Sequence, residues 1–238
     1  MDKQTIRETV WDRLSEDGIA RFPFPPHGRI PNFDGADVAA EVVCHRHEWQ
    51  QASVIKCNPD SPQRPIREQA LVAGKLVYMA VPRLRDERCF LRLDPDEIDD
   101  HGRAATLSGS EEYGEAVLPD ALEPIDLIVT GSVAVSRRGD RIGKGEGFSD
   151  LEYAILIELG LVDSTTPIMT TVHSSQIVDI PFERKEHDIR LDLVGTPDTV
   201  IEITEPKPKH PGIMWELLSD DACKQMPILA RFHRNNEL

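Results

Sequence analysis

The sequence predicts a three-layer α/β/α fold with a mostly parallel central sheet. Short apolar runs rich in valine and isoleucine alternate with segments whose apolar residues recur at helical spacing. This alternation builds parallel sheets that are covered by helices on both faces. Strands are predicted at residues 53–57, 76–81, 127–135, 167–173, 189–193 and 200–203. No apolar run approaches the ~20 residues of a membrane helix, so we expect no membrane span.

Composition limits the class of protein further. The length of 238 residues suits one α/β domain, and we expect it to be a monomer or a homodimer. A net charge of −15 repels nucleic acid phosphates, which argues against nucleic acid as a partner. Four cysteines without metal-ligand spacing indicate reduced thiols, and the N-terminus has no apolar signal region. We therefore expect a cytoplasmic protein.

The N-terminal part of the chain carries the clearest helical patterns. Helices are predicted at residues 2–17, 36–48 and 64–74. In the first of them Ile6, Val10 and Leu14 recur every four residues, which gives one apolar face. Gly74 is the expected C-cap of the third helix, because glycine readily adopts the left-handed conformation that ends a helix.

A proline-rich arm at residues 21–35 separates the first two helices. Its four prolines and two glycines prevent a helix there. It also holds Phe22, Phe24, Ile30 and Phe33, and we expect these large apolar side chains to be buried. The segment is therefore predicted to be an ordered extended arm or a binding loop.

Two further segments have weaker patterns. Residues 94–124 are acidic and poor in large apolar residues, which favours a long surface excursion, such as a flap over a pocket. The α/β domain is predicted to span residues 1–204. Residues 205–238 form a tail with an amphipathic segment, expected to pack on the domain or on a partner subunit.

The central feature of the chain is a strand, a basic glycine-rich loop and a helix within residues 126–157. Gly143, Gly145 and Gly147 stand at alternate positions in the loop, and Asp150 opens the helix. Such a loop can bring backbone N–H groups close to a phosphate. The spacing matches neither GxGxxG nor the Walker pattern, and it is equally typical of a plain turn.

The charges in this loop favour the phosphate interpretation. Arg141 and Lys144 supply two cations, and Asp150 supplies a carboxylate within ten residues. A nucleotide phosphate with Mg²⁺ suits this set, since Mg²⁺ is usually held by one or two carboxylates plus substrate phosphates.

Polar residues also follow two other predicted strands. Asn58 and Asp60 come after one strand, and Arg83 and Arg85 come after the next. Ligands of open α/β sheets bind beyond the carboxyl ends of strands, so these residues are candidates for substrate binding. The alternative for the two arginines is that they pair with the acidic dipeptide 86–87 that follows them.

Three blocks of the sequence resemble one known family. Residues 141–150, RIGKGEGFSD, resemble the R-[LI]-G-x-G-x-G-[YF]-x-D motif of the 5-formyltetrahydrofolate cyclo-ligase family. Residues 176–192 resemble its Q-x-V-x-x-[LI]-P…H-D-x-x-[VL]-D signature, and Lys3 with Arg7 resembles its N-terminal K-x-x-[LI]-R pattern. The GKGEGF loop and the RIPNF stretch are most similar to the branch of methenyltetrahydrofolate synthase domain-containing proteins.

The resemblance implies a Rossmann-like fold and an ATP-dependent, Mg²⁺-requiring cyclisation of 5-formyltetrahydrofolate to 5,10-methenyltetrahydrofolate. In that family's pattern Arg141 and Lys144 are catalytic, and Asp150 holds the metal. The residues implied to bind ATP are Lys3, Arg7, Arg141, Gly143, Lys144, Gly145, Gly147 and Phe148. The residues expected to bind the folate substrate are Asn58, Asp60 and Arg83.

Two departures from the family motif bear on activity. Glu146 stands where cyclo-ligases of the R-G-K-G-Y-Y-D form carry lysine, and Ser149 replaces a tyrosine. The chain is therefore either a cyclo-ligase or an inactive folate- or nucleotide-binding protein with a regulatory or interaction role. For an active enzyme we expect Glu146 to point away from the phosphates or to pair with Arg137, Arg138 or Arg83. We also expect an exposed loop, in which Arg141→Ala costs little stability.

Overall fold

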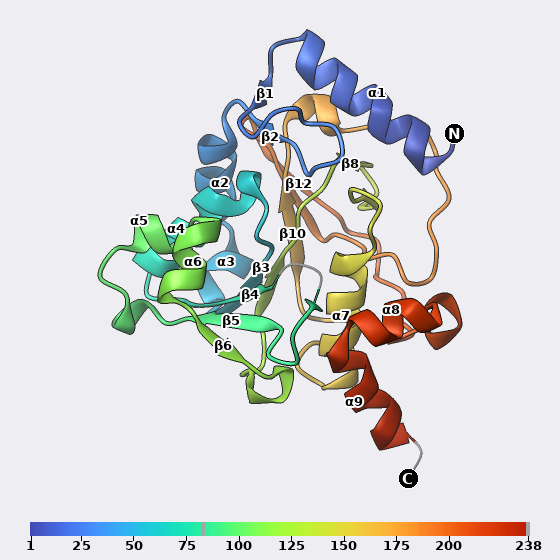
Figure 1. Cartoon of the computed structure of the whole chain (residues 1–238). Coiled ribbons are helices and arrows are strands. Elements are labelled where there is room, and N and C mark those ends of the chain that lie inside the picture. Colours follow the sequence, from blue (N-terminus) through green and yellow to red (C-terminus); the bar gives the residue numbers. More distant parts are fainter. Residues whose placement is uncertain (82–83, 237–238) are drawn as a thin grey trace.

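A computed structural model describes residues 1–81 and 84–236. Its centre is an eight-stranded sheet in the order β12-β11-β10-β7-β3-β4-β5-β6 (Figure 1). The strands are β3 (Val54–Cys57), β4 (Leu76–Ala80), β5 (Phe90–Leu93), β6 (Glu115–Val117), β7 (Leu127–Val129), β10 (Ile168–Thr171), β11 (Leu193–Gly195) and β12 (Val200–Glu202). The five strands from β11 to β4 are parallel to one another, whereas the pairs β11–β12, β4–β5 and β5–β6 are antiparallel. The predicted mostly parallel sheet is confirmed.

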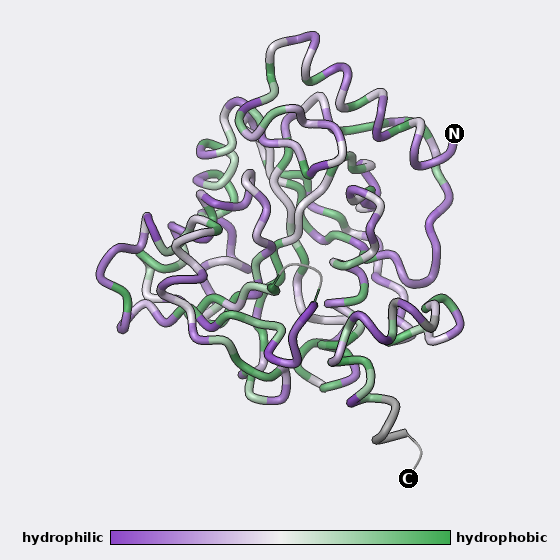
Figure 2. Tube along the Cα trace, in the orientation of Figure 1, coloured by the Kyte–Doolittle hydropathy of each residue, from purple (hydrophilic) through white to green (hydrophobic). Residues whose placement is uncertain are grey.

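Helices cover both faces of this sheet, as predicted. The first face carries α2 (Ala36–Cys44), α3 (His47–Gln51), α4 (Arg64–Val72) and α5 (His101–Ala104), which share one apolar core. The second face carries α7 (Phe148–Glu158), which packs in a separate core. Neighbouring residues of one strand alternate between the two cores: Ile55 belongs to the first and Val54 to the second. Figure 2 shows hydrophobic stretches along the central strands.

Helix α1 (Lys3–Glu16) lies above the glycine-rich loop and closes one end of the domain (Figure 1). Asp2 caps it by accepting hydrogen bonds from the N–H groups of residues 4 and 5 at 3.0 Å. The apolar face that the sequence predicts is buried: Ile6, Val10 and Leu14 pack against the segment that follows β7. This packing holds the polar face of α1 beside the loop.

Two predicted strands differ from the structure. The run at 127–135 is not one strand, because the chain leaves the sheet after Val129 and forms a small antiparallel pair, β8 (Ala134–Val135) with β9 (Arg141–Ile142). The N–H of Val133 bonds to the carbonyl of Ile142 at 2.8 Å instead of to a neighbour in the sheet. The run at 189–193 contributes only the start of β11, which lies next to the edge strand β12.

The proline-rich arm is ordered, but half of its predicted burial is wrong. The short strands β1 (Ala20–Arg21) and β2 (Asn32–Phe33) pair across it. Ile30 and Phe33 are buried, whereas Phe22 is 77% exposed and Phe24 is 61% exposed. The two exposed phenylalanines lie in the part of the arm beyond this pairing, where the core does not reach.

The segment at 94–124 is not a surface excursion. It contains α5, α6 (Leu107–Tyr113) and β6, which pairs with β5. Small residues pack closely here: Ala104, Gly109 and Ser110 are all buried. Small residues therefore allow these elements to pack closely, while acidic residues such as Glu97, Glu111 and Glu112 are exposed.

The tail packs on the domain beside α7 (Figure 1). It ends in α8 (Asp220–Gln225) and α9 (Pro227–Asn236). Ile213, Met226, Ile228 and Leu229 are buried in the same core as the apolar face of α7. Among the described helices, none has the length and apolar character needed to cross a membrane.

We expect His210 to make attachment of the tail sensitive to acid. Its ring packs edge-on against Tyr153 at 4.9 Å, and its Nδ1 accepts a hydrogen bond from the N–H of Gly212 at 3.1 Å. Burial lowers the pKa of His210, so its folded-state pKa is below the unfolded value. The stability that the neutral ring provides is therefore complete above the unfolded pKa and is lost as pH falls through the folded pKa.

We expect the midpoint of thermal unfolding to fall between neutral pH and pH 5 more steeply in the wild type than in His210→Gln, whose side chain stays neutral. Scanning both proteins at matched ionic strength measures the difference. Parallel pH profiles would show that protonation of His210 does not loosen the tail.

Candidate functional site: a basic loop at the N-terminus of a helix

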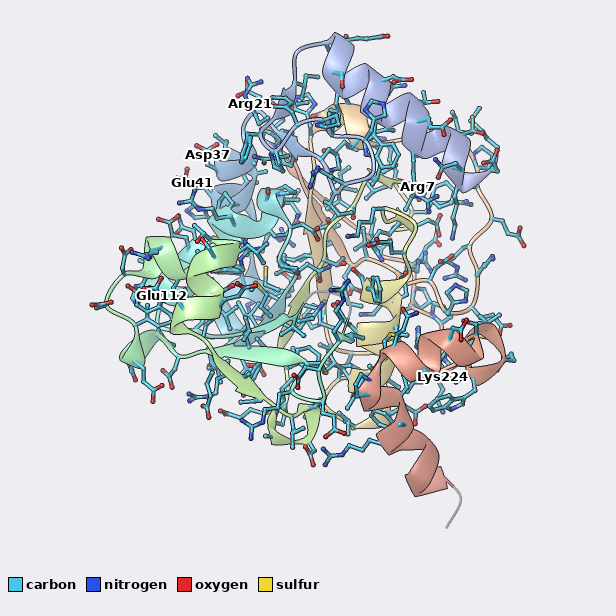
Figure 3. The ribbon with its side chains drawn as sticks, in the orientation of Figure 1. Arg7, Arg21, Asp37, Glu41, Glu112 and Lys224 are labelled. Atoms are coloured by element: carbon cyan, nitrogen blue, oxygen red, sulfur yellow. The ribbon has the colours of Figure 1, made fainter. Side chains whose placement is uncertain are left out.

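The charged residues predicted to surround a phosphate line one cavity of about 230 Å³, which we call the loop cavity. The cavity lies between α1, the glycine-rich loop and the first turn of α7. Figure 3 labels Arg7, which lines the cavity from α1. The predicted site residues that line it are Lys3, Arg7, Asp60, Arg141, Gly143, Lys144, Gly145, Gly147, Phe148 and Asp150. The structure thus brings together cations that are up to about 140 residues apart in the sequence.

The glycines of the loop let arginine side chains approach the loop backbone closely. Gly145 has φ +105°, and a Cβ added there would lie 3.3 Å from Cζ of Arg7. A Cβ added to Gly143 would lie 2.9 Å from Nη1 of Arg141, a distance that forces a shift. Gly147 is the N-cap of α7, so the free N–H groups of the first helical turn open onto the cavity.

Arg141 is buried, and this overturns the expectation that it lies in an exposed loop. It is 5% exposed, whereas residues 144–147 are exposed. Its Nη1 donates to the carbonyl of Gly131 at 2.7 Å, and its Nη2 donates to Oδ1 of Asp150 at 3.0 Å. Arg141 therefore ties the loop both to the chain leaving β7 and to the first turn of α7.

The other two predicted cations come from α1. Nε of Arg7 donates to the carbonyl of Gly143 at 2.7 Å, and Nζ of Lys3 pairs with Oδ2 of Asp188 at 2.5 Å. The pKa of Arg7 is lowered, first by burial and then by the nearby Arg141 guanidinium. Crowded cations of this kind are stabilised when an anion binds between them.

Asp150 is the candidate Mg²⁺ ligand, and its surroundings fit that role. Its Oδ1 accepts hydrogen bonds from Arg141 and from the N–H of Ile189 at 3.1 Å. Its carboxylate faces the loop cavity. Within residues 1–81 and 84–236, no three His, Cys, Asp or Glu side chains are grouped to hold a metal. A Mg²⁺ ion here would be held by one carboxylate together with phosphate oxygens.

Glu146 has a partner that the sequence did not suggest. Its Oε2 lies 2.6 Å from Nζ of Lys144, two residues earlier in the loop. Arg137 and Arg138 contact other carboxylates, those of Asp179 and Asp140, each at 3.8 Å. Glu146 thus neutralises the loop lysine that the family pattern assigns to catalysis. The third candidate partner, Arg83, lies outside the described residues.

Of the residues predicted to bind substrate, Asp60 lies in the loop cavity and Asn58 lies outside it. Asp60 lines the loop cavity, and burial raises the pKa of its carboxyl. Asn58 is 3% exposed and does not line the cavity. Its Oδ1 accepts from Nζ of Lys56 at 2.6 Å, and its Nδ2 donates to Oγ of Ser149 at 2.7 Å. Asn58 therefore supports the loop through Ser149, and its contact with substrate stays a prediction. Nothing is described for Arg83.

The same network contains two residues that the sequence reading missed. Lys56 of β3 and Glu152 of α7 form an ion pair in which both side chains are buried. It links the centre of the sheet to the helix that begins at the glycine-rich loop. The sequence does contain an indication of this pair, since Lys56 interrupts the apolar strand VIKC and Glu152 interrupts the apolar helix. Charged residues of opposite sign at such positions indicate a buried pair.

The fold and the loop cavity define an α/β protein with a basic, glycine-rich loop at the N-terminus of a helix. The chain belongs to the 5-formyltetrahydrofolate cyclo-ligase family, whose family model matches residues 2–197. This confirms the resemblance seen in the sequence motifs.

Curated relatives refine that assignment. The chain is 41% identical over 241 residues to a methenyltetrahydrofolate synthase domain-containing protein of Bos taurus, covering 100% of this chain and 63% of the relative. It is 42% identical over 233 residues to the protein of that name from Mus musculus, covering 96% of this chain and 62% of the relative. The chain therefore spans less than two thirds of these relatives.

A solved structure supports the fold. The structure of 5,10-methenyltetrahydrofolate synthetase from Aquifex aeolicus is similar to this one with a TM-score of 0.54 and 16% identity. The match covers 87% of this chain and 96% of the other. At this identity the likeness concerns the fold alone.

Proposed function

We propose that the protein catalyses the ATP-dependent cyclisation of 5-formyltetrahydrofolate to 5,10-methenyltetrahydrofolate. The observation that carries the proposal is the convergence of Lys3, Arg7, Arg141 and Lys144 with the start of α7 on one cavity. Phosphoryl transfer needs little covalent chemistry from a protein, and it depends on cations and N–H groups that are held in place around the phosphates. Family membership supplies the substrate class.

The proposed reaction balances in two steps. The formyl oxygen attacks the γ-phosphorus of ATP, the bond to the bridging oxygen breaks, and ADP leaves with the bonding electrons. N10 then attacks the formyl carbon, inorganic phosphate leaves, and the N10 proton passes to solvent. The ring that closes is that of 5,10-methenyltetrahydrofolate.

The described side chains have distinct parts in this scheme. Arg7 and Lys3 reach the phosphates from α1, and Lys144 reaches them from the loop. Arg141 holds the loop and Asp150 in place through its two hydrogen bonds. Mg²⁺, where bound by Asp150 and the phosphates, neutralises negative charge that develops on the transferred group.

The alternative is a folate- or nucleotide-binding protein without turnover. The ion pair between Lys144 and Glu146 favours it, because a lysine that is already paired with a carboxylate stabilises a phosphoryl group less. Both functions require the same cavity, and they differ in whether ADP is released in the presence of the folate.

The pair at Glu146 gives a direct test. We expect the wild type to release ADP only when 5-formyltetrahydrofolate is present, and we expect Glu146→Lys to raise kcat. The increase in kcat should be about tenfold, which is less than the 10²–10³-fold change in kcat that one preorganised donor contributes. ADP release is measured with ATP, Mg²⁺ and saturating folate.

Glu111→Lys is the matched control, because Glu111 is exposed on α6 and does not line the loop cavity. It makes the same change in charge and should leave kcat unaltered. ATP and folate binding without ADP release in either the wild type or Glu146→Lys would support the binding-protein alternative instead.

A further inference from the structure

A second and larger cavity of about 920 Å³ opens beside the loop cavity, and we call it the tail cavity. The two cavities are adjacent, because several residues line both of them. These shared residues are Glu146, Gly147, Phe148, Asp150, Lys185 and His187. A ligand in the tail cavity would therefore lie next to a phosphate held by the loop.

The tail supplies one apolar wall of this cavity. Met214, Leu217, Leu218 and Met226 line it, and all four follow residue 197, where the match to the family ends. Buried neighbours of this segment pack into the main core, which fixes its position. The wall therefore belongs to a part of the chain that the family match does not cover.

Helix α7 supplies a second apolar part of the lining. Phe148, Leu151 and Ala154 come from this helix. An aromatic ring together with aliphatic side chains suits a flat ring system, since such pockets are mostly apolar with a few polar groups for orientation.

The charges of the tail cavity are unevenly placed. Lys185 lines both cavities, whereas Arg85 lines the tail cavity alone. Arg85 is exposed, so its guanidinium is accessible to a ligand. A guanidinium recognises a carboxylate through two parallel hydrogen bonds.

We propose that residues 212–226 complete the binding site of the folate and set its specificity. The pterin ring lies between the tail wall and α7, with its reactive end at the shared residues, and its glutamate carboxylates face Arg85. This inference rests on the proposed function. The inference extends the proposed function by assigning a substrate-binding role to the tail and to Arg85.

Leu217 offers the cleanest test of the tail wall. Its side chain is 56% exposed, so Leu217→Asp should fold normally while placing a carboxylate beside the ring site. We expect the Kd for 5-formyltetrahydrofolate to rise by about tenfold or more and the Kd for Mg²⁺–ATP to stay within about twofold. Leu107→Asp, at a residue that is 47% exposed on α6, is the matched control. Calorimetry measures both constants, and thermal unfolding checks the fold.

Arg85 is tested with two ligands. Arg85→Gln should weaken binding of 5-formyltetrahydrofolate by about tenfold, the value of one lost charge-assisted contact. It should leave unchanged the binding of a 5-formyl pterin analogue that lacks the glutamate. Arg88→Gln, an exposed arginine of the same segment that does not line the tail cavity, is the control.

The outcomes separate this inference from the proposed function. Wild-type binding of the folate with no loss in Leu217→Asp or Arg85→Gln would overturn the inference alone. Failure of the wild type to bind the folate at all would overturn the proposed function and the inference together. Loss of folate binding in the two variants, with ATP binding retained, is the expected result.

Discussion

Replacing Lys56 with methionine is expected to lower the free energy of unfolding by about 3–5 kcal/mol, the usual cost of leaving one partner of a buried ion pair uncompensated. Lys56 and Glu152 are 2% and 5% exposed, so neither charge can be solvated by a small movement. Asn58 would also lose the ammonium that orients its amide. Denaturant unfolding of the wild type and Lys56→Met measures the difference.

The double variant Lys56→Met/Glu152→Leu is the control for this expectation. Replacement of both partners by apolar side chains of similar volume is often neutral or stabilising, since no charge is then left buried. We expect the double variant to recover most of the lost stability. A double variant as unstable as Lys56→Met would show that the loss comes from packing and not from the stranded carboxylate.

Arg141→Ala is expected to abolish nucleotide binding and also to destabilise the fold by about 3 kcal/mol, because it breaks a mostly buried pair. The guanidinium is 5% exposed and bonds to the Gly131 carbonyl and to Asp150. Without it, the loop loses its link to β7 and Asp150 loses its orientation. Calorimetry with Mg²⁺–ATP and denaturant unfolding measure the two effects.

Arg141→Lys keeps the charge but cannot donate to both acceptors with a fixed planar group. We expect it to recover part of the stability and little of the affinity for ATP. Full affinity in Arg141→Ala would mean that this arginine only shapes the turn. Unchanged stability would mean that its two hydrogen bonds are replaced by water.

The sequence predicted the main features of the fold because they depend on local pattern. The apolar runs gave six of the strand positions, and the spacing of Ile6, Val10 and Leu14 gave the buried face of α1. The convergence of α1 with the glycine-rich loop was predicted from the family resemblance, since no local pattern joins Lys3 to Gly145.

The errors concern contacts between distant residues. The apolar run after β7 was predicted to continue the strand, but Val133 finds its backbone partner in Ile142 instead. The burial of Arg141 depends on the carbonyl of Gly131, whose position only the folded chain fixes. Phe22 and Phe24 were expected in the core because of their hydrophobicity, although hydrophobic residues are also common on protein surfaces.

The measurement that tests the central claim most directly follows the absorbance of 5,10-methenyltetrahydrofolate. Purified protein is mixed with 5-formyltetrahydrofolate, ATP and Mg²⁺, and each component is omitted in turn. The account predicts that product accumulates only in the complete mixture and at the same rate as ADP. Absence of product in the complete mixture, with both ligands shown to bind, would contradict the account and leave a binding protein in its place.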